Sequence, residues 1–89
     1  MIERETVIVN PLGMHARPAA QVVRLTAGFG ANIELECDGQ TVNGKSIMGV
    51  MMLAAGKGSK VIIETEGERA DEALQALLQL IADRFGEEE

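Results

Sequence analysis

The segment that spans residues 70–85 carries the strongest pattern in this sequence. Its apolar residues recur at intervals of three and four positions, so they share one face of a predicted helix: Ala70, Ala73, Leu74, Leu77, Leu78, Ile81 and Phe85. Gly86 follows as the expected helix stop. A helix with one apolar face must bury that face against another layer. Because 89 residues provide only one core, we expect a single domain over residues 1–89.

Short strand-like and helix-like segments alternate before this helix. Ile33, Leu35 and Cys37 alternate with acidic residues, which is the period of a half-buried strand, so Cys37 is expected in the core. Asp38 and Gly39 predict a two-residue hairpin turn. Further strands are expected at residues 6–9, 40–42 and 60–66, and further helices at residues 16–27 and 47–53. The order βαββαβα, with polar residues on one side of the second strand, predicts a two-layer α/β sandwich of the α+β type.

The composition requires an aliphatic core, since 46% of the residues are hydrophobic but only Phe29 and Phe85 are aromatic. In the predicted helix at residues 16–27, small residues recur at helical spacing and imply close packing on the sheet; they are Ala16, Ala19, Ala20, Val23 and Ala27. Cys37 is the only cysteine, so no disulfide can form within the chain, and a reducing compartment fits.

The formal net charge is −6, from eight basic and fourteen acidic residues. Nucleic acids and anionic membranes attract positive patches, so we expect neither as a partner. Residues 1–5 do not resemble a signal peptide, and no apolar run approaches the roughly 20 residues that span a bilayer. We expect a soluble, cytoplasmic protein without membrane insertion, whose acidic tail at residues 87–89 is frayed.

The single histidine lies where a loop runs into the first turn of a predicted helix. Pro18 suits that first turn, which places His15 at or near the N-cap. The N–H groups of Ala16 and Arg17 and the positive end of the helix dipole then form an anion site. A helix N-terminus repels a cation, so the neutral, nucleophilic imidazole is favoured there. The amides and the Arg17 guanidinium can receive the negative charge of a phosphoryl group.

These residues alone also fit a simpler interpretation, in which His15 only caps the helix and Arg17 is a solvated surface charge. The chain has no second histidine, so we expect no metal site, no catalytic triad and no cofactor. The stretch at residues 56–60 superficially resembles a phosphate loop. It lacks the spacing of that loop and precedes a strand, so it is interpreted as a turn.

Two stretches resemble the signatures of a known family. Residues 12–19, Leu-Gly-Met-His-Ala-Arg-Pro-Ala, are similar to the active-site signature of HPr, the histidine phosphocarrier of the bacterial phosphotransferase system. Residues 44–51, Gly-Lys-Ser-Ile-Met-Gly-Val-Met, are similar to its second signature, around a regulatory serine. The resemblance covers essentially the whole chain and implies one HPr-like domain over residues 1–89. It also implies the family's fold, an open-faced β-sandwich of four antiparallel strands with three helices on one face.

The resemblance implies roles for individual residues. His15 matches the residue that enzyme I phosphorylates on Nδ1 at the expense of phosphoenolpyruvate, and Arg17 matches the residue that neutralises the phosphoryl group. Ser46 matches the serine that an ATP-dependent HPr kinase/phosphorylase modifies in many bacteria, which lowers phosphate acceptance at the histidine. Its place before the predicted helix at residues 47–53 is equally explained by a role as N-cap.

The predicted helix at residues 47–53 has apolar side chains around most of its circumference, so some of them must face solvent. Val50 and Leu53 are expected in the core. Exposed methionines suit a surface that docks several different partners. The expected docking residues are Ala20, Arg24, Lys45, Ile47, Met48 and Met51.

We expect a stoichiometric carrier and not an enzyme. In this hypothesis a monomer accepts a phosphoryl group on His15 from phosphorylated enzyme I and donates it to an enzyme IIA-type acceptor in sugar uptake. Two alternatives remain open. Residues 12–14 and the acidic end of the chain also resemble the nitrogen-related branch of the family, whose phosphate passes to a regulatory acceptor. The other alternative is an interaction module with the same order of elements, in which His15 is a bystander.

Overall fold

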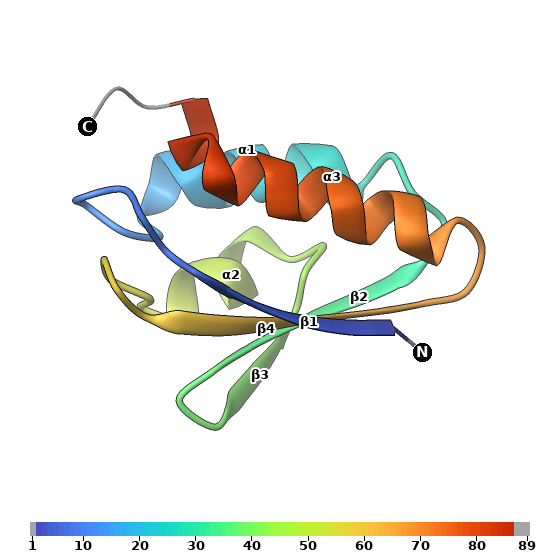
Figure 1. Ribbon diagram of the computed structural model, residues 1–89, viewed down its shortest axis with the longest axis horizontal. Coiled ribbons are helices and arrows are strands. Elements are labelled where there is room, and N and C mark those ends of the chain that lie inside the picture. The colour runs from blue at the N-terminus through green and yellow to red at the C-terminus, as the bar shows by residue number, and fades with distance from the viewer. Residues whose placement is uncertain (1, 87–89) are drawn as a thin grey trace.

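The computed structural model describes residues 2–86 of the chain. Three helices cover one face of a four-stranded sheet (Figure 1). In chain order the elements are β1 (Ile2–Val7), α1 (Ala16–Thr26), β2 (Asn32–Cys37), β3 (Gln40–Asn43), α2 (Ile47–Met52), β4 (Lys60–Glu66) and α3 (Ala70–Ala82), followed by a 3-10 turn, η1 (Arg84–Gly86). The predicted fold class and element order are confirmed. The acidic tail predicted at residues 87–89 lies outside the described residues.

All the strand pairs of the sheet are antiparallel, in the order β1-β4-β2-β3, so the last strand in sequence lies inside the sheet. The β2–β3 hairpin turns through Asp38 and Gly39, whose φ angles are 52° and 82°. Two consecutive left-handed residues are what a type I′ turn requires, and Asp and Gly tolerate that conformation well. The predicted hairpin is therefore confirmed.

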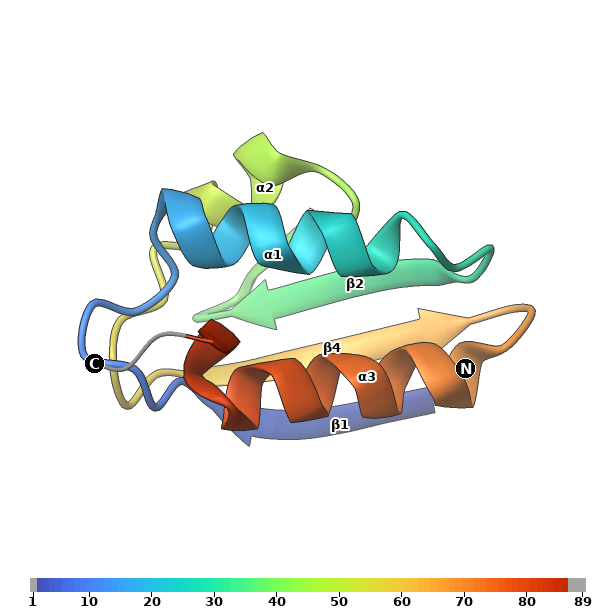
Figure 2. The ribbon, with the colours of Figure 1, turned by 90° about the horizontal axis from the view of Figure 1, so that it is seen from above.

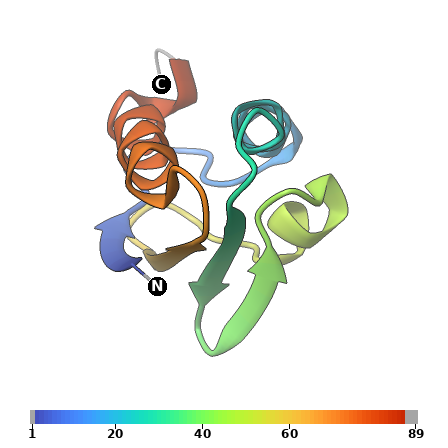
Figure 3. The ribbon, with the colours of Figure 1, turned by 90° about the vertical axis from the view of Figure 1, so that its right-hand side faces the viewer.

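The core fills the space between the sheet and the helices, and the two layers separate clearly in Figure 3. Figure 2 looks down on α1 and α3, which lie over the strands. Its members include Ile33, Leu35 and Cys37 from β2, Val61 and Ile63 from β4, and Leu74, Leu77 and Ile81 from α3. Burial raises the pKa of the Cys37 thiol, and the charge of Asp38 adds to this effect. Cys37 is thus a buried, protonated thiol in the core, as its strand alternation predicted.

The first strand does not lie where the sequence predicted it. It spans Ile2–Val7 instead of residues 6–9. Charged residues dilute the apolar signal over the first half of this strand, but pairing with β4 fixes its register, from Ile2 opposite Thr65 to Val7 opposite Lys60. An edge strand with one solvated face needs few apolar residues, which is why composition alone misplaced it.

The last helix is shorter than its apolar pattern predicted. It ends at Ala82 and not at residue 85. Arg84 and Phe85 both have a φ of 57°, so the chain leaves the helix through left-handed backbone. This change of direction buries Phe85, which is only 3% exposed. Phe85 therefore belongs to the core, but through a separate turn.

The buried face of α1 is rotated relative to the predicted one. The helix buries Pro18, Ala19, Val22 and Thr26. Ala16 and Ala27, at its two ends, are exposed. Alanine is compatible with either face of a helix, so the alanine spacing gave too weak a signal. The larger side chains that fill the core determine the rotation of α1 about its own axis.

The uncovered face of the sheet carries a row of carboxylates. Glu3, Glu64 and Glu34 lie opposite one another on β1, β4 and β2. Desolvation and the negative charges of Glu3, Glu34 and Glu36 raise the pKa of Glu64. Like charges directly opposite each other destabilise a sheet.

We expect Glu64→Gln to increase the stability of the protein near pH 7. A carboxyl group whose pKa is raised by folding favours the folded state at low pH, and this contribution is lost as the pH rises through the folded-state pKa. The gain should therefore shrink as the pH falls below about 4, where glutamate is protonated in both states. Urea unfolding at neutral pH and at the lower pH measures this gain in the free energy of unfolding. Glu68→Gln, in the turn before α3, is the control. An equal gain from both variants would contradict the attribution of the gain to repulsion at Glu64.

Candidate functional site

His15 is the N-cap residue of α1, as the sequence predicted. Its backbone is extended (φ −92°, ψ −169°), and its carbonyl oxygen accepts a hydrogen bond from the Ala19 amide at 3.0 Å. Pro18 is buried in the first turn, where its missing N–H is not needed. The sequence around the histidine therefore starts the helix directly after the imidazole.

The amides of Ala16 and Arg17 occupy the first two helical positions, which have no acceptor within an α-helix. Both residues are exposed, and the His15 side chain is half-buried beside them. The N-terminal end of the helix dipole adds positive potential at this point. Residues 15–17 thus bring together a nucleophilic ring nitrogen, two helix-terminal amides and a guanidinium. This arrangement suits transfer of an anionic group to and from the imidazole.

The loop before α1 is held by residues that are not among the predicted site residues. Asn10 is fully buried, and its side-chain amide donates to the Gly13 carbonyl oxygen at 2.8 Å. The Met14 amide donates to the Ala55 carbonyl oxygen at 2.7 Å, which connects this loop to the segment after α2. The only sequence signal was the Asn-Pro dipeptide, which predicts a turn and not a buried amide.

Ser46 is the N-cap of α2, and its Oγ accepts a hydrogen bond from the Gly49 amide at 3.1 Å. The predicted capping role is confirmed. Ser46 is half-buried. Val50 and Leu53 are 0% and 5% exposed, so their predicted place in the core is also confirmed.

The exposed side of α2 is apolar. Ile47, Met48 and Met51 are 42%, 68% and 41% exposed, as expected for docking residues. Met52, at 62%, belongs to the same surface but was not among the predicted docking residues. We call these four residues the α2 surface. Large exposed apolar side chains grouped on one short helix are typical of a protein-binding surface.

The helices α1 and α2 pack against each other, and Figure 3 shows them side by side. Ala20 and Arg24 follow Arg17 by three and seven residues and therefore share its side of α1; Ala20 is half-buried and Arg24 is exposed. The Lys45 ammonium instead donates to the Phe29 carbonyl oxygen at 2.7 Å, past the C-terminal end of α1. The length of α1, roughly 16 Å, separates that end from His15. The Lys45 ammonium therefore lies beside the end of α1 that carries Arg24, and not beside the histidine.

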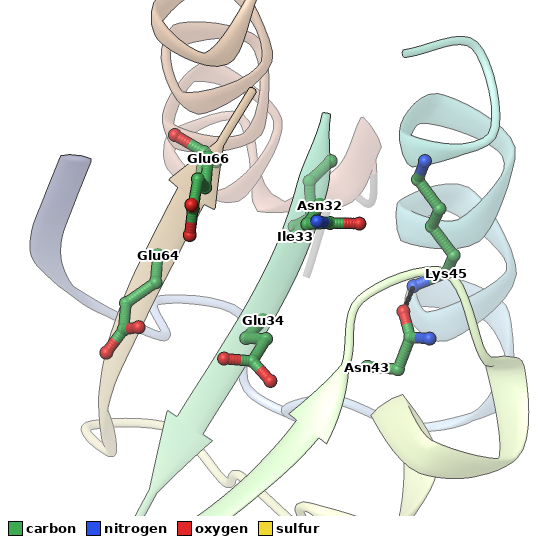
Figure 4. Close-up of a pocket in the computed structure, with 8 residues that line it drawn as sticks. Asn32, Ile33, Glu34, Asn43, Lys45, Glu64 and Glu66 are labelled. Atoms are coloured by element: carbon green, nitrogen blue, oxygen red, sulfur yellow. Dashed lines mark hydrogen bonds between the residues drawn. The ribbon is translucent and has the colours of Figure 1, made fainter. Parts of the chain in front are cut away.

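A hollow of about 350 Å³ opens at one end of the uncovered sheet face (Figure 4). It is lined by Asn32, Ile33, Glu34, Asn43, Lys45, Glu64, Thr65 and Glu66. Glu34, Glu64 and Glu66 would repel a phosphate, so this hollow does not suit the anionic group expected at His15. Among residues 2–86, no three His, Cys, Asp or Glu side chains are placed to hold a metal ion, and no helix is long and apolar enough to cross a membrane.

The model of the PTS HPr component phosphorylation site family matches residues 2–83. This chain belongs to the HPr family. It is 52% identical to phosphocarrier protein HPr of Cupriavidus necator over the full length of both chains. It is 49% identical to phosphocarrier protein HPr of Pseudomonas aeruginosa over 96% of each chain. The fold matches the crystal structure of HPr-C-His from Thermoanaerobacter tengcongensis with a TM-score of 0.95, at 44% identity and over 100% of both chains.

Membership in the HPr family confirms the resemblance of residues 12–19 and 44–51 to the family's signatures. It supports the role of a phosphocarrier in the phosphotransferase system. The matched region includes His15, Arg17 and Ser46. Their individual roles, and those of the docking residues, stay predictions that require the experiments below.

Proposed function

We propose that this HPr protein accepts a phosphoryl group on His15 from phosphorylated enzyme I and donates it to an enzyme IIA-type acceptor in sugar uptake. The supporting observation is the place of the chain's one histidine at the N-cap of α1, with Arg17 exposed two residues later. The protein is a stoichiometric carrier, and its partners catalyse both transfers. It acts as a monomer in the cytoplasm, with residues 1–89 forming its single domain.

In this proposal the α1 N-terminus supplies the groups that receive the phosphoryl oxygens, and the family resemblance assigns the transfer to Nδ1. The lone pair of Nδ1 of His15 forms a bond to phosphorus, while the bond from phosphorus to the donor atom of enzyme I breaks and leaves its electron pair on that atom. The amides of Ala16 and Arg17 and the Arg17 guanidinium stabilise the phosphoryl oxygens. Transfer to the acceptor reverses these steps.

The test is to incubate the protein with enzyme I and phosphoenolpyruvate and to measure its intact mass. The expected result is an acid-labile increase of one phosphoryl group, which is lost again when an enzyme IIA-type acceptor is added. An adduct that passes only to a nitrogen-branch regulatory acceptor would assign the protein to that branch. If enzyme I yields no adduct, the carrier function is wrong and an interaction module becomes the better hypothesis.

The α2 surface provides the contact with partners in this proposal, together with Ala20 and Arg24. Met48 is its most exposed residue. We expect Met48→Asp to raise the KM of phosphorylation by enzyme I about tenfold, because a charge at the centre of an apolar contact removes on the order of 1–2 kcal/mol of binding. Stability should stay within about 0.5 kcal/mol of the parent, since the side chain faces solvent.

Gln75→Asp is the matched control for Met48→Asp, because it adds the same charge at an exposed position of α3. α3 packs against α1, β1 and β4, whereas α2 packs against α1 and β3. The control should keep the parental KM. An unchanged KM in Met48→Asp would show that the α2 surface does not contact enzyme I.

Ser46 is the proposed regulatory site for an HPr kinase/phosphorylase that uses ATP. A phosphate there would lie at the start of α2, where the helix dipole tolerates negative charge, and it would alter the docking surface without unfolding the helix. ATP and a host extract are expected to give an acid-stable adduct on the parent and none on Ser46→Ala. Absence of this adduct from the parent would remove the support for regulation at Ser46.

A further inference from the structure

Asn10 is a fully buried polar side chain in the loop that leads to His15. Its Nδ2 donates to the Gly13 carbonyl oxygen at 2.8 Å, and the Gly13 amide donates back to the Asn10 carbonyl oxygen at 3.1 Å. These two bonds close the turn at residues 10–13 from both sides. Asn and Asp side chains commonly order turns through such local bonds, but few of them are completely buried.

The Gly13 carbonyl oxygen has a second donor, the His15 amide, at 3.1 Å. Asn10 therefore shares an acceptor with the backbone of the proposed phosphoryl acceptor. The intervening residue is anchored as well, because Met14 is 5% exposed and its amide donates to the Ala55 carbonyl oxygen at 2.7 Å. With both peptide groups before His15 fixed, the backbone at His15 has little freedom to move.

We propose that Asn10 is a positioning residue for phosphoryl transfer at His15. Its side-chain amide orients the Gly13 carbonyl group and, through it, holds the His15 backbone and ring at the start of α1. The inference rests on the proposed carrier function and deepens it. Transfer requires the ring nitrogen, the phosphorus and the leaving atom to be aligned, so a small displacement of the imidazole lowers the rate. The docking residues lie on α2 and farther along α1, at Ala20 and Arg24, outside the turn at residues 10–13. We therefore expect Asn10 to affect the rate of transfer and not the binding of enzyme I.

The test compares Asn10→Ala with Thr65→Val in phosphorylation by enzyme I. Thr65 is also 0% exposed, and its hydroxyl donates to the Ala70 carbonyl oxygen at 3.0 Å, but at the start of α3. We expect Asn10→Ala to lower kcat about tenfold or more with KM within about twofold of the parent. Thr65→Val should keep both constants within about twofold while losing thermal stability. Asn10→Ser, whose hydroxyl can still donate locally, should recover part of the kcat.

The amide and ring resonances of His15, recorded by NMR without enzyme I, give a readout that does not depend on transfer. They should shift or broaden in Asn10→Ala and stay unchanged in Thr65→Val. If Asn10→Ala does not fold, Asn10→Ser supplies both measurements, with smaller changes in the same direction. Parental resonances or a parental kcat in the Asn10 variants, or an equal kcat loss in Thr65→Val, would overturn the inference. Absence of an adduct on the parent would instead refute the carrier function, and the resonances would still decide the positioning role.

Discussion

His15→Ala is expected to abolish the acid-labile adduct that enzyme I and phosphoenolpyruvate form on the parent protein. The chain has no other histidine, so no other imidazole can replace the acceptor nitrogen. The fold should survive, because the residue is half-buried and its side chain makes no capping hydrogen bond to α1. Intact mass before and after mild acid treatment measures the effect.

Ser46→Ala is the matched control for His15→Ala, because it also replaces an N-cap residue by alanine, at the start of α2. It removes the bond from the Gly49 amide and should cost about 1 kcal/mol of stability. It should nevertheless keep the full adduct. Persistence of the acid-labile adduct in His15→Ala would place the acceptor at another residue.

Gly13→Ala is expected to lower the free energy of unfolding by roughly 2–4 kcal/mol. Gly13 has a φ of +67°, and left-handed backbone costs a residue with a Cβ about 1–2 kcal/mol. A Cβ there would also lie 2.5 Å from the Ala55 carbonyl oxygen and 2.7 Å from the Gly56 Cα, both of which are backbone atoms. The two loops must move apart, which also displaces the carbonyl group that accepts the His15 amide.

Substitutions at two other glycines measure the backbone cost of Gly13→Ala separately from its steric cost. Gly58 has a φ of +87°, but a Cβ added there would have nothing within 4 Å. Gly58→Ala should therefore show only the cost of left-handed backbone. Gly30 has open space and no left-handed backbone, so Gly30→Ala should be neutral or stabilising by about 0.4–1 kcal/mol. Urea unfolding gives all three values. A loss for Gly13→Ala no larger than that for Gly58→Ala would contradict the close approach of the two loops.

The sequence could predict those elements that depend on patterns among neighbouring residues. Alternation in β2, the Asp38–Gly39 turn and the capping position of Ser46 depend on neighbouring residues, and all three are confirmed. The extent of β1 depends on its pairing with β4, and the end of α3 depends on the burial of Phe85. These are contacts between distant segments, which no local pattern contains.

The same distinction applies to the site. His15 at the N-cap of α1 was predictable, because Pro18 marks the first turn of the helix locally. The roles of Asn10 and Gly13 were not, because both depend on how the loop packs into the core and against the segment after α2. The exposure of Met52 also required the orientation of α2 relative to the sheet.

The most direct test of the proposed carrier is an NMR measurement on the ¹⁵N-labelled protein before and after phosphorylation by enzyme I. If the α1 N-terminus holds the phosphoryl group, Nδ1 of His15 should couple to phosphorus, and the Ala16 and Arg17 amide protons should move downfield as they donate to its oxygens. Phosphorus bound at any other residue, or a phosphorylated His15 with both amides unmoved, would contradict this role of the helix N-terminus.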